Sequence, residues 1–252
     1  MRFAPAALSA GLALAAGCGR PPPAVEIRLD GVPDLSQHDP ALGDAARAEN
    51  LCAPVAVSDS LAWLAGDTDR ARQIALARRL ADLMGTSPHA GTPPAGLVAG
   101  VERHLREVGT PIARLEYAGF RPVATRHRSR AVLGLDWIVA GLGPRRAVWL
   151  NVGWYRSPSP GYYRRIGGHW VVAVGYRDGR LAIHDPGPWA DAGADPQTLK
   201  ARELRALVFE FEGSFDYPGP LLIELRNART PTPGVRAFID GAVLLETAER
   251  PP

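Results

Sequence analysis

The sequence contains little lysine, little cysteine and no long apolar run, and each of these shortages excludes a class of protein or of binding site. Lys200 is the only lysine among 29 basic residues, so the net charge of +3 reflects an arginine-rich composition and not a phosphate-binding surface. The apolar run at residues 3–16 is too short to span a bilayer as a helix. A chain of 252 residues, 46% of them hydrophobic and without an internal repeat, can bury one sizeable core and requires no second. We therefore expect one compact domain behind a short leader.

A basic cluster around His127 is the candidate for nucleic-acid binding. Arg121, Arg126, Arg128 and Arg130 surround this histidine, but the stretch has no helical apolar period and no interleaved aromatic residues on which bases could stack. We interpret it as a solvated loop and expect no nucleic-acid partner.

The first residues are typical of a signal peptide, with one charge at Arg2, the apolar run and then small residues. The five residues ending at Cys18 resemble a bacterial lipobox, in which the cysteine after the cleavage site is acylated. This predicts a lipoprotein signal peptide over residues 1–17 and a proline-rich tether over residues 18–30. The protein is then expected in the bacterial cell envelope, anchored to the membrane by a lipid at Cys18 and facing the periplasm or the exterior. Cleavage after Ala15, giving a secreted protein, stays open.

The two cysteines, Cys18 and Cys52, would normally indicate a disulfide in an exported protein. A lipidated Cys18 cannot form one, and Cys52 is then an unpaired thiol, which is a sign of reactivity. If the signal peptide is cut after Ala15 instead, a Cys18–Cys52 bridge is the structural alternative.

The order of the periodic segments predicts helices first and strands second. Helical patterns begin at Pro54 and continue to 66, then run from 69 to 84 and from 94 to 108, and the first of them places Cys52 at a helix N-terminal edge. A short helix is expected over 133–142. Strands are expected at residues 24–35, 112–117, 147–154, 169–176, 181–184, 207–211, 221–225, 235–238 and 243–246, with a loop at 157–161 and a turn at Asp240-Gly241. This order predicts an α+β fold over residues 31–252, with N-terminal helices packed on a C-terminal antiparallel sheet.

A cysteine, a histidine and an aspartate occupy positions that could support nucleophilic catalysis. A helix N-terminus favours the thiolate, which is the nucleophilic form of Cys52. His169 follows Gly167-Gly168 and is expected to be the first residue of a strand, with no neighbouring side chain crowding its ring. The Asp178-Gly179 turn then returns the chain to Asp185. In such a hairpin Asp185 lies about three positions from the partner of His169, within reach if a turn or bulge intervenes. A thiol needs a base, and the base needs an orienting group.

Three sequence blocks resemble the cysteine peptidases that process bacteriocin leaders, family thirty-nine of the papain-like clan, and their broad bacterial peptidase-like relatives. The blocks are Val32-Pro33-Asp34-Leu35-Ser36-Gln37, Asn50-Leu51-Cys52-Ala53-Pro54, and Gly168-His169-Trp170-Val171-Val172 continuing through Gly175-Tyr176 to His184-Asp185-Pro186. The resemblance implies a papain-like two-layer fold, with Cys52 as nucleophile, His169 as general base and Asp185 as its partner. It also makes Gln37 the candidate oxyanion donor, with Asn50 and Glu49 as alternatives, beside the backbone N–H of Cys52.

These residues predict an exported cysteine peptidase or related amide hydrolase that acts through a thioester on a peptide or a peptidoglycan-type substrate. The alternative is a catalytically silent envelope lipoprotein that holds a peptide in its cleft. We expect a monomer without a cofactor. We also expect no metal site, because Cys52, His169 and His184 lack a pair of ligands at short spacing. His184 should lie on the other face of its strand from Asp185, packed or at the surface.

Overall fold

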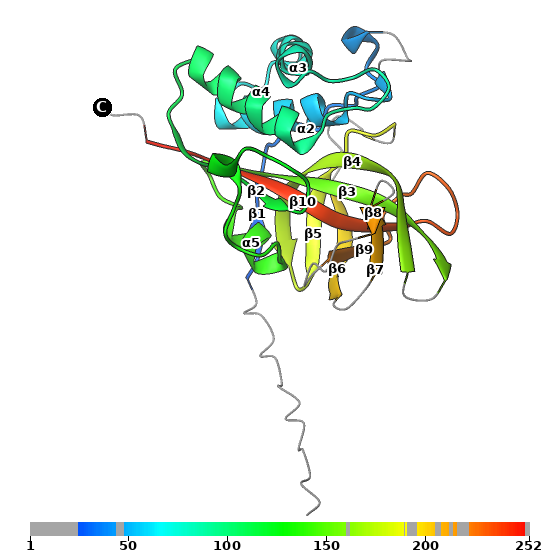
Figure 1. The fold of residues 1–252 in the computed structure, drawn as a ribbon. Coiled ribbons are helices and arrows are strands. Elements are labelled where there is room, and N and C mark those ends of the chain that lie inside the picture. Colours follow the sequence, from blue (N-terminus) through cyan, green and yellow to red (C-terminus); the bar gives the residue numbers. More distant parts are fainter. Residues whose placement is uncertain are drawn as a thin grey trace, which may run out of the picture.

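Helices form one layer of the molecule and a large, mostly antiparallel sheet forms the other, which makes the protein an α+β fold (Figure 1). The computed structural model describes residues 25–43, 48–159, 162–188, 190, 196–204, 208–211, 214–215 and 222–249. The predicted signal peptide over residues 1–17, Cys18 and the tether up to residue 24 lie outside the described residues. Within these ranges, no helix is long and apolar enough to cross a membrane.

The helical layer consists of α2 (Cys52–Leu64), α3 (Arg70–Met84) and α4 (Pro94–Glu107), and the three predicted helices are confirmed. Asp69 caps α3 by accepting a hydrogen bond from the Arg72 N–H at 2.8 Å. The central helix α2 is apolar on nearly all sides, and its residues 52–62 are buried against the neighbouring helices and the sheet. This burial fixes the start of α2, and therefore Cys52, relative to the sheet.

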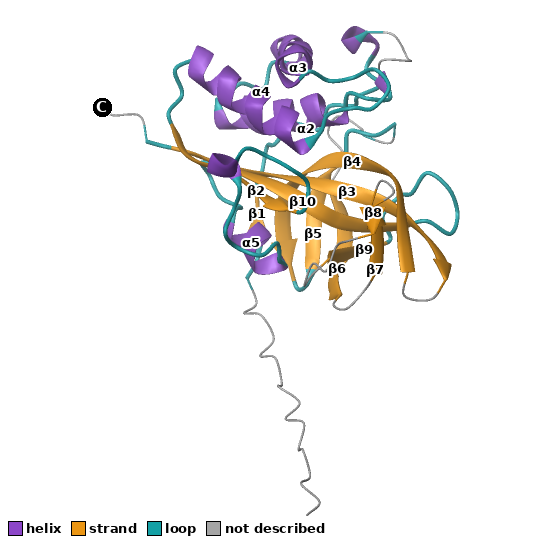
Figure 2. Ribbon diagram, in the orientation of Figure 1, coloured by secondary structure: helices purple, strands orange, loops and turns teal. Residues whose placement is uncertain are grey.

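The sheet is one continuous system of hydrogen-bonded strands (Figure 2). Its strands are β1 (Ile27–Arg28), β2 (Ile112–Gly119), β3 (Arg146–Ser159), β4 (Tyr162–Arg177), β5 (Arg180–His184), β6 (Gln197–Leu204), β7 (Val208–Phe211), β8 (Ser214–Phe215), β9 (Leu222–Arg226) and β10 (Arg236–Thr247). Pairing runs in a closed ring from β3 through β4, β5, β6, β9 and β10 back to β3. β7 joins β4 in parallel, and β1 pairs with β4, so the end of the predicted tether belongs to the fold.

Side chains that alternate along the strands divide the core in two. Trp149 of β3 and Val172 of β4 face the helices and pack in one cluster with Ala53 and Val57 of α2. The residues that alternate with these along the strands face the interior of the ring, where they meet α5 (Leu135–Ala140) and the other strands. They include Leu150, Val171, Ala173, Ile183, Leu199, Ile223 and Ile239. The ring is therefore filled on the inside and covered by helices on one outer face.

Three local predictions about the strands are wrong. Asp240-Gly241 does not turn but lies inside β10, where a bulge between Ile239 and Gly241 lets the strand continue. His169 does not open a strand, because β4 begins at Tyr162 and forms a long hairpin with β3. Residues 157–159, expected in a loop, extend β3 for the same reason. β6, β8 and the 3-10 helices η1 (Pro40–Leu42) and η2 (Thr125–His127) were not predicted at all.

Candidate functional site

Cys52 is the first residue of α2, so the prediction that it lies at a helix N-terminal edge is confirmed. It is a free, buried cysteine. Leu51, the N-cap residue, provides no side-chain hydrogen bond to the first turn of the helix. The N–H groups of a first turn have no acceptor within the helix, and together with the helix dipole they favour a negative charge at this end.

The hairpin of β4 and β5 brings His169 and Asp185 together. Asp178 and Gly179 both have positive φ, 50° and 72°, which is the conformation of a tight two-residue hairpin turn. A bulge between Ala173 and Gly175 then shifts the register, so that Val172 pairs with His184. Because of this shift, Asp185, which directly follows β5, comes within reach of His169. The bulge is the irregularity that the sequence analysis named as the condition for this contact.

One imidazole ring lies beside both the thiol and the carboxylate. The Nε2 atom of His169 lies 2.5 Å from Oδ1 of Asp185, and both side chains are 10% exposed. The same Asp185 oxygen accepts the backbone N–H of Gly187 at 3.0 Å, which fixes its orientation. Cys52 lies close enough to His169 to raise the pKa of the ring. Since Asp185 engages Nε2, Nδ1 is the ring nitrogen that remains available to the thiol.

The surroundings of His169 favour its protonated form. Burial by itself lowers the pKa of the ring, but the charge and the hydrogen bond of Asp185, followed by the interaction with Cys52, outweigh it. The pKa of His169 is raised from 6.5 to about 10 as a result. The site therefore holds a proton on the histidine at neutral pH.

Trp154 of β3 covers the histidine, contrary to the expectation of an uncrowded ring. The two ring centroids are 5.8 Å apart with an angle of 15° between the planes, and His169 pairs with Val152 on the same strand. Gly167 gives the tryptophan room, since a Cβ atom there would lie in tight contact, 3.0 Å from Cε3 of the tryptophan. Stacking and the Asp185 contact together restrict the ring to one orientation.

A cavity of about 510 Å³ opens beside His169, within the size range of small-ligand pockets. Loops of the helical layer and strands of the sheet contribute to it. The lining residues are Gln37, His38, Glu49, Asn50, His89, Ala90, Arg121, Trp154, Arg165, Gly167, Gly168, His169, Gly187, Pro188 and Pro231. A substrate bound in this space would lie against the base.

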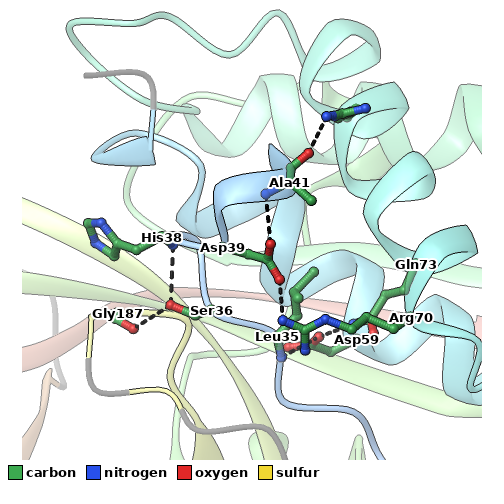
Figure 3. A network of polar contacts seen from close by, with 10 residues as sticks. Leu35, Ser36, His38, Asp39, Ala41, Asp59, Arg70, Gln73 and Gly187 are labelled. Atoms are coloured by element: carbon green, nitrogen blue, oxygen red, sulfur yellow. Dashed lines mark hydrogen bonds and ion pairs between the residues drawn. The ribbon is translucent and has the colours of Figure 1, made fainter. Parts of the chain in front are cut away.

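Gln37 is held beside the base by the loop that follows Asp185. Its backbone N–H donates to the carbonyl oxygen of Pro186 at 2.7 Å, and the hydroxyl of Ser36 donates to that of Gly187 at 3.3 Å. Figure 3 shows Ser36 between Gly187 and the N–H of His38. The structure thus brings Gln37 and His169 to one cavity although they are far apart in the sequence.

Helix α2 anchors the same segment from the other side. The carboxyl of Asp59 accepts the N–H of Leu35 at 3.2 Å and the side-chain amide of Gln73 at 2.5 Å (Figure 3). Asp59 is fully buried, and burial is the main reason that its pKa is raised well above the usual value, with the charge of Asp34 adding to the effect. The helix that carries Cys52 therefore also positions the segment that carries Gln37.

The alternatives to Gln37 are placed less favourably as oxyanion donors. The side-chain amide of Asn50 donates to the carbonyl oxygen of Pro88 at 2.6 Å, and Glu49 has only acceptors when ionised. Gln37 is 4% exposed, and its Oε1 has no hydrogen-bond partner among the described residues. An amide can be placed with its oxygen and nitrogen exchanged, so either end can serve the cavity.

His184 and His127 lie outside this arrangement. Nδ1 of His184 lies 2.9 Å from the carbonyl oxygen of Pro33, and burial lowers its pKa, as expected for a packed residue. His127 is buried against Leu115. No group of three or more histidine, cysteine, aspartate or glutamate side chains in the described ranges could hold a metal ion.

The residues on the sheet side of the cavity were missed from the sequence. Trp154, Arg121 and Arg165 line it, but only the long β3–β4 hairpin reveals that Trp154 pairs with Gly167 and that Gly153 pairs with Gly168. The one local signal was Gly167-Gly168 beside a histidine, which indicates a close approach of other groups to a strand.

In comparisons with protein-family models and with curated proteins, the sequence has no match. The function is therefore argued from the geometry of Cys52, His169, Asp185 and the adjoining cavity.

Proposed function

We propose that the protein is a cysteine hydrolase with a papain-like fold, which cleaves a peptide or related amide bond using Cys52, His169 and Asp185. The observation that carries the proposal is one histidine ring that lies 2.5 Å from a carboxylate and whose pKa is raised by a neighbouring thiol at a helix start. A structural cysteine has no need of a base, and a histidine beside an inert buried thiol has no need of an orienting carboxylate. The division of nucleophile and base between a helical layer and a sheet supports the papain-like assignment.

At neutral pH the proton of the Cys52–His169 pair resides on His169, so in the first step the sulfur forms a bond directly to the carbonyl carbon of the substrate. The π electrons of the carbonyl move to its oxygen, which gives a tetrahedral oxyanion. Asp185 stabilises the imidazolium and leaves Nδ1 available to the thiol. The raised pKa of His169 favours this charged pair.

In the second step the carbon–nitrogen bond breaks, and His169 returns its proton to the leaving amine. Cys52 then carries the acyl group as a thioester. Water attacks the thioester while His169 accepts its proton, the carbon–sulfur bond breaks, and the proton returns to sulfur. The products are an amine and a carboxylic acid, and the thiol is regenerated.

The oxyanion requires hydrogen-bond donors at the edge of the cavity. The backbone N–H of Cys52, in the first turn of α2, provides one. We assign the second to the side-chain N–H of Gln37, because this residue lines the cavity together with His169 and an amide N–H can donate to an oxyanion.

Selective alkylation of Cys52 tests the proposal. Iodoacetamide should modify Cys52 in the native protein at neutral pH about tenfold or more faster than in the unfolded chain, since the thiolate is the reacting species. His169→Ala should remove this difference, whereas His104→Ala, a half-buried histidine on α4, should retain it. The rates are measured by mass spectrometry of the peptide that contains Cys52.

Equal rates in native wild type, native His169→Ala and the unfolded chain would contradict the proposal. That result would favour a binding protein that holds peptides without cleaving them.

We also propose that the protein is a lipoprotein of the bacterial cell envelope, attached through Cys18. The mass of the mature protein should then correspond to an acylated N-terminal Cys18, and Cys18→Ala should release the protein from the membrane fraction. A mature chain that begins at Ala16 and fractionates as a soluble protein would instead indicate secretion.

A further inference from the structure

Four cationic side chains lie in a row across four neighbouring strands, on the outside of the ring. In the register of the sheet Arg177 of β4 pairs with Arg180 of β5. Arg180 then pairs with Lys200 of β6, and Lys200 with Arg226 of β9. All four side chains are exposed, because they alternate with residues that pack inside the ring, among them Tyr176, Leu181, Leu199 and Leu225. These four cations are here called the basic row.

The two central cations of the basic row have no acidic partner among the described residues. Nη1 of Arg177 lies 3.3 Å from Oε1 of Glu26, but neither Arg180 nor Lys200 makes an ion pair in the described ranges. Like charges directly opposite one another destabilise a sheet. The repulsion between Arg180 and Lys200 therefore costs stability, and an anionic surface would relieve it.

The acidic residues beside the basic row leave it with an excess of positive charge. Asp178 lies in the turn between β4 and β5. Glu224 is 3.5 Å from Arg226 but also pairs with Arg236, so its charge is shared between two arginines. The row can therefore still attract anions from solution.

The basic row lies beside the point where the chain from Cys18 enters the fold. β1 pairs with the end of β4, where Ile27 is opposite Tyr176. A hollow of about 350 Å³ opens here, and its lining includes Glu26, Arg177, Arg180 and Thr198. The seven residues from Cys18 to Ala24 span at most about 25 Å. A lipid on Cys18 would therefore keep this side of the sheet close to the bilayer.

The catalytic cavity lies at the other end of the same strand. Arg180 is the first residue of β5 and Asp185 directly follows the last, a separation of about 16 Å along a strand. A membrane in contact with the basic row would therefore be at the end of β5 away from Asp185, and the cavity beside His169 would remain open to solvent.

We infer that the basic row docks on anionic phospholipid headgroups and orients the anchored domain with its catalytic cavity directed away from the membrane. The inference rests on the proposed attachment through Cys18 and not on the chemistry of Cys52. Cations near an anionic bilayer are attracted by its negative surface potential, each contributing about fivefold to binding. The short chain from Cys18 favours a membrane over a soluble polyanion, because it confines the row to the bilayer surface.

Vesicle binding tests the inference in the whole mature chain from residue 18, made without its leader and therefore without a lipid. Co-sedimentation at low salt compares vesicles of phosphatidylglycerol and phosphatidylcholine in equal parts with vesicles of phosphatidylcholine alone. The wild type should prefer the anionic vesicles, and Arg180→Gln with Lys200→Gln should lower its affinity for them about tenfold or more. Thermal unfolding checks the fold, and the loss of two opposed like charges should leave the Tm unchanged or raise it.

Arg103→Gln with Arg106→Gln is the matched control. It removes the same charge from α4, in the helical layer, where both arginines make exposed ion pairs one helical turn away that contribute little to stability. Its affinity for the anionic vesicles should stay within about threefold of the wild type. An equal loss in the two double variants would mean that net charge alone decides the affinity, and the inference would be wrong.

Lys200 reports the contact directly, because it is the only lysine in the chain. In the acylated protein the lipid holds the domain on both kinds of vesicle. Acetylation of Lys200 by N-hydroxysuccinimide acetate, followed by mass spectrometry, should be about threefold or more slower on the anionic vesicles. Equal rates on both would show that the basic row does not face the membrane and would overturn the inference.

A single-stranded oligonucleotide is the competing polyanion. If it binds the unacylated chain more tightly than the anionic vesicles do, and the Arg180→Gln, Lys200→Gln variant loses that binding, the row serves a soluble partner and the inference is overturned.

The outcomes of the two proposals are separate. Alkylation of Cys52 should proceed at the wild-type rate in the Arg180→Gln, Lys200→Gln variant, so failure of the membrane inference leaves the hydrolase untouched. A mature protein without a lipid on Cys18 removes the anchor, and the inference then fails together with the proposed attachment.

Discussion

Replacing Asp185 by alanine should lower kcat/KM by about 10²- to 10⁴-fold, because the His169 ring loses both its orientation and the charge that stabilises the imidazolium. Asp185→Asn keeps an acceptor for the ring and removes only the charge, so its effect on kcat/KM should be smaller. Rates are measured with any fluorescence-quenched peptide that the wild type hydrolyses. A kcat/KM for Asp185→Ala within a few-fold of wild type would remove Asp185 from the mechanism.

The pH dependence separates the charge of Asp185 from its structural role. His169 must be protonated to donate to the leaving amine, and its pKa is about 10, so wild-type activity should fall as the pH rises through about 10. Asp185→Asn removes the charge that contributes most to raising the pKa of His169. Burial, which lowers this pKa, is then opposed by the weaker contribution of Cys52. The alkaline limb of the pH profile should therefore move down towards neutrality. If the alkaline limb of the profile stays in place, its pKa belongs to a group other than His169.

The same shift links His169 to stability. A histidine whose pKa is raised on folding contributes stability that is fully present below its ordinary pKa of 6.5 and is lost as the pH rises through about 10. In Asp185→Asn the difference in unfolding free energy between acidic and alkaline solution should shrink. This readout needs no substrate.

Breaking the ion pair between Arg165 and Asp240 should have the largest effect on stability. Arg165→Met leaves a fully buried carboxylate without its cation, which costs about 3–5 kcal/mol of unfolding free energy. In the double variant Arg165→Met with Asp240→Asn, a neutral amide replaces the charge and still accepts the hydroxyl of Tyr155, so most of the loss should be recovered. Urea unfolding at neutral pH measures all three proteins.

The double variant is the decisive comparison. If it were as unstable as Arg165→Met alone, the loss would come from the packing of the arginine side chain and not from an uncompensated charge.

Local patterns predicted the helices well, because their period, caps and stops lie within a few residues of one another. Asp69 caps α3 and Gly85, with φ of 62°, ends it, and both signals are visible in the sequence. The position of Cys52 at the start of α2 followed from the same kind of signal. The contact between His169 and Asp185 needed the bulge between Ala173 and Gly175, which no local pattern specifies.

Two Asp-Gly pairs show that a local turn signal does not always predict a turn. At Asp178-Gly179 the glycine has φ of 72° and the chain turns, as such a pair favours. At Asp240-Gly241 the chain runs straight on, because the Asp240 side chain is bound by Arg165, 75 positions away, and Gly241 makes room for the hydroxyl of Tyr117. Partners distant in the sequence decided the second case.

The sequence by itself determined the order of helices and strands, the position of Cys52 at a helix N-terminal edge and the turn that returns the chain from His169 to Asp185, because these depend on neighbouring residues. Only the tertiary structure decided that β4 begins seven positions before His169, at Tyr162, and that Trp154 stacks on the ring. It alone also brought Arg121 and Arg165 to the cavity. These features arise from the pairing of β3 with β4 and from burial, which connect residues that no local period relates.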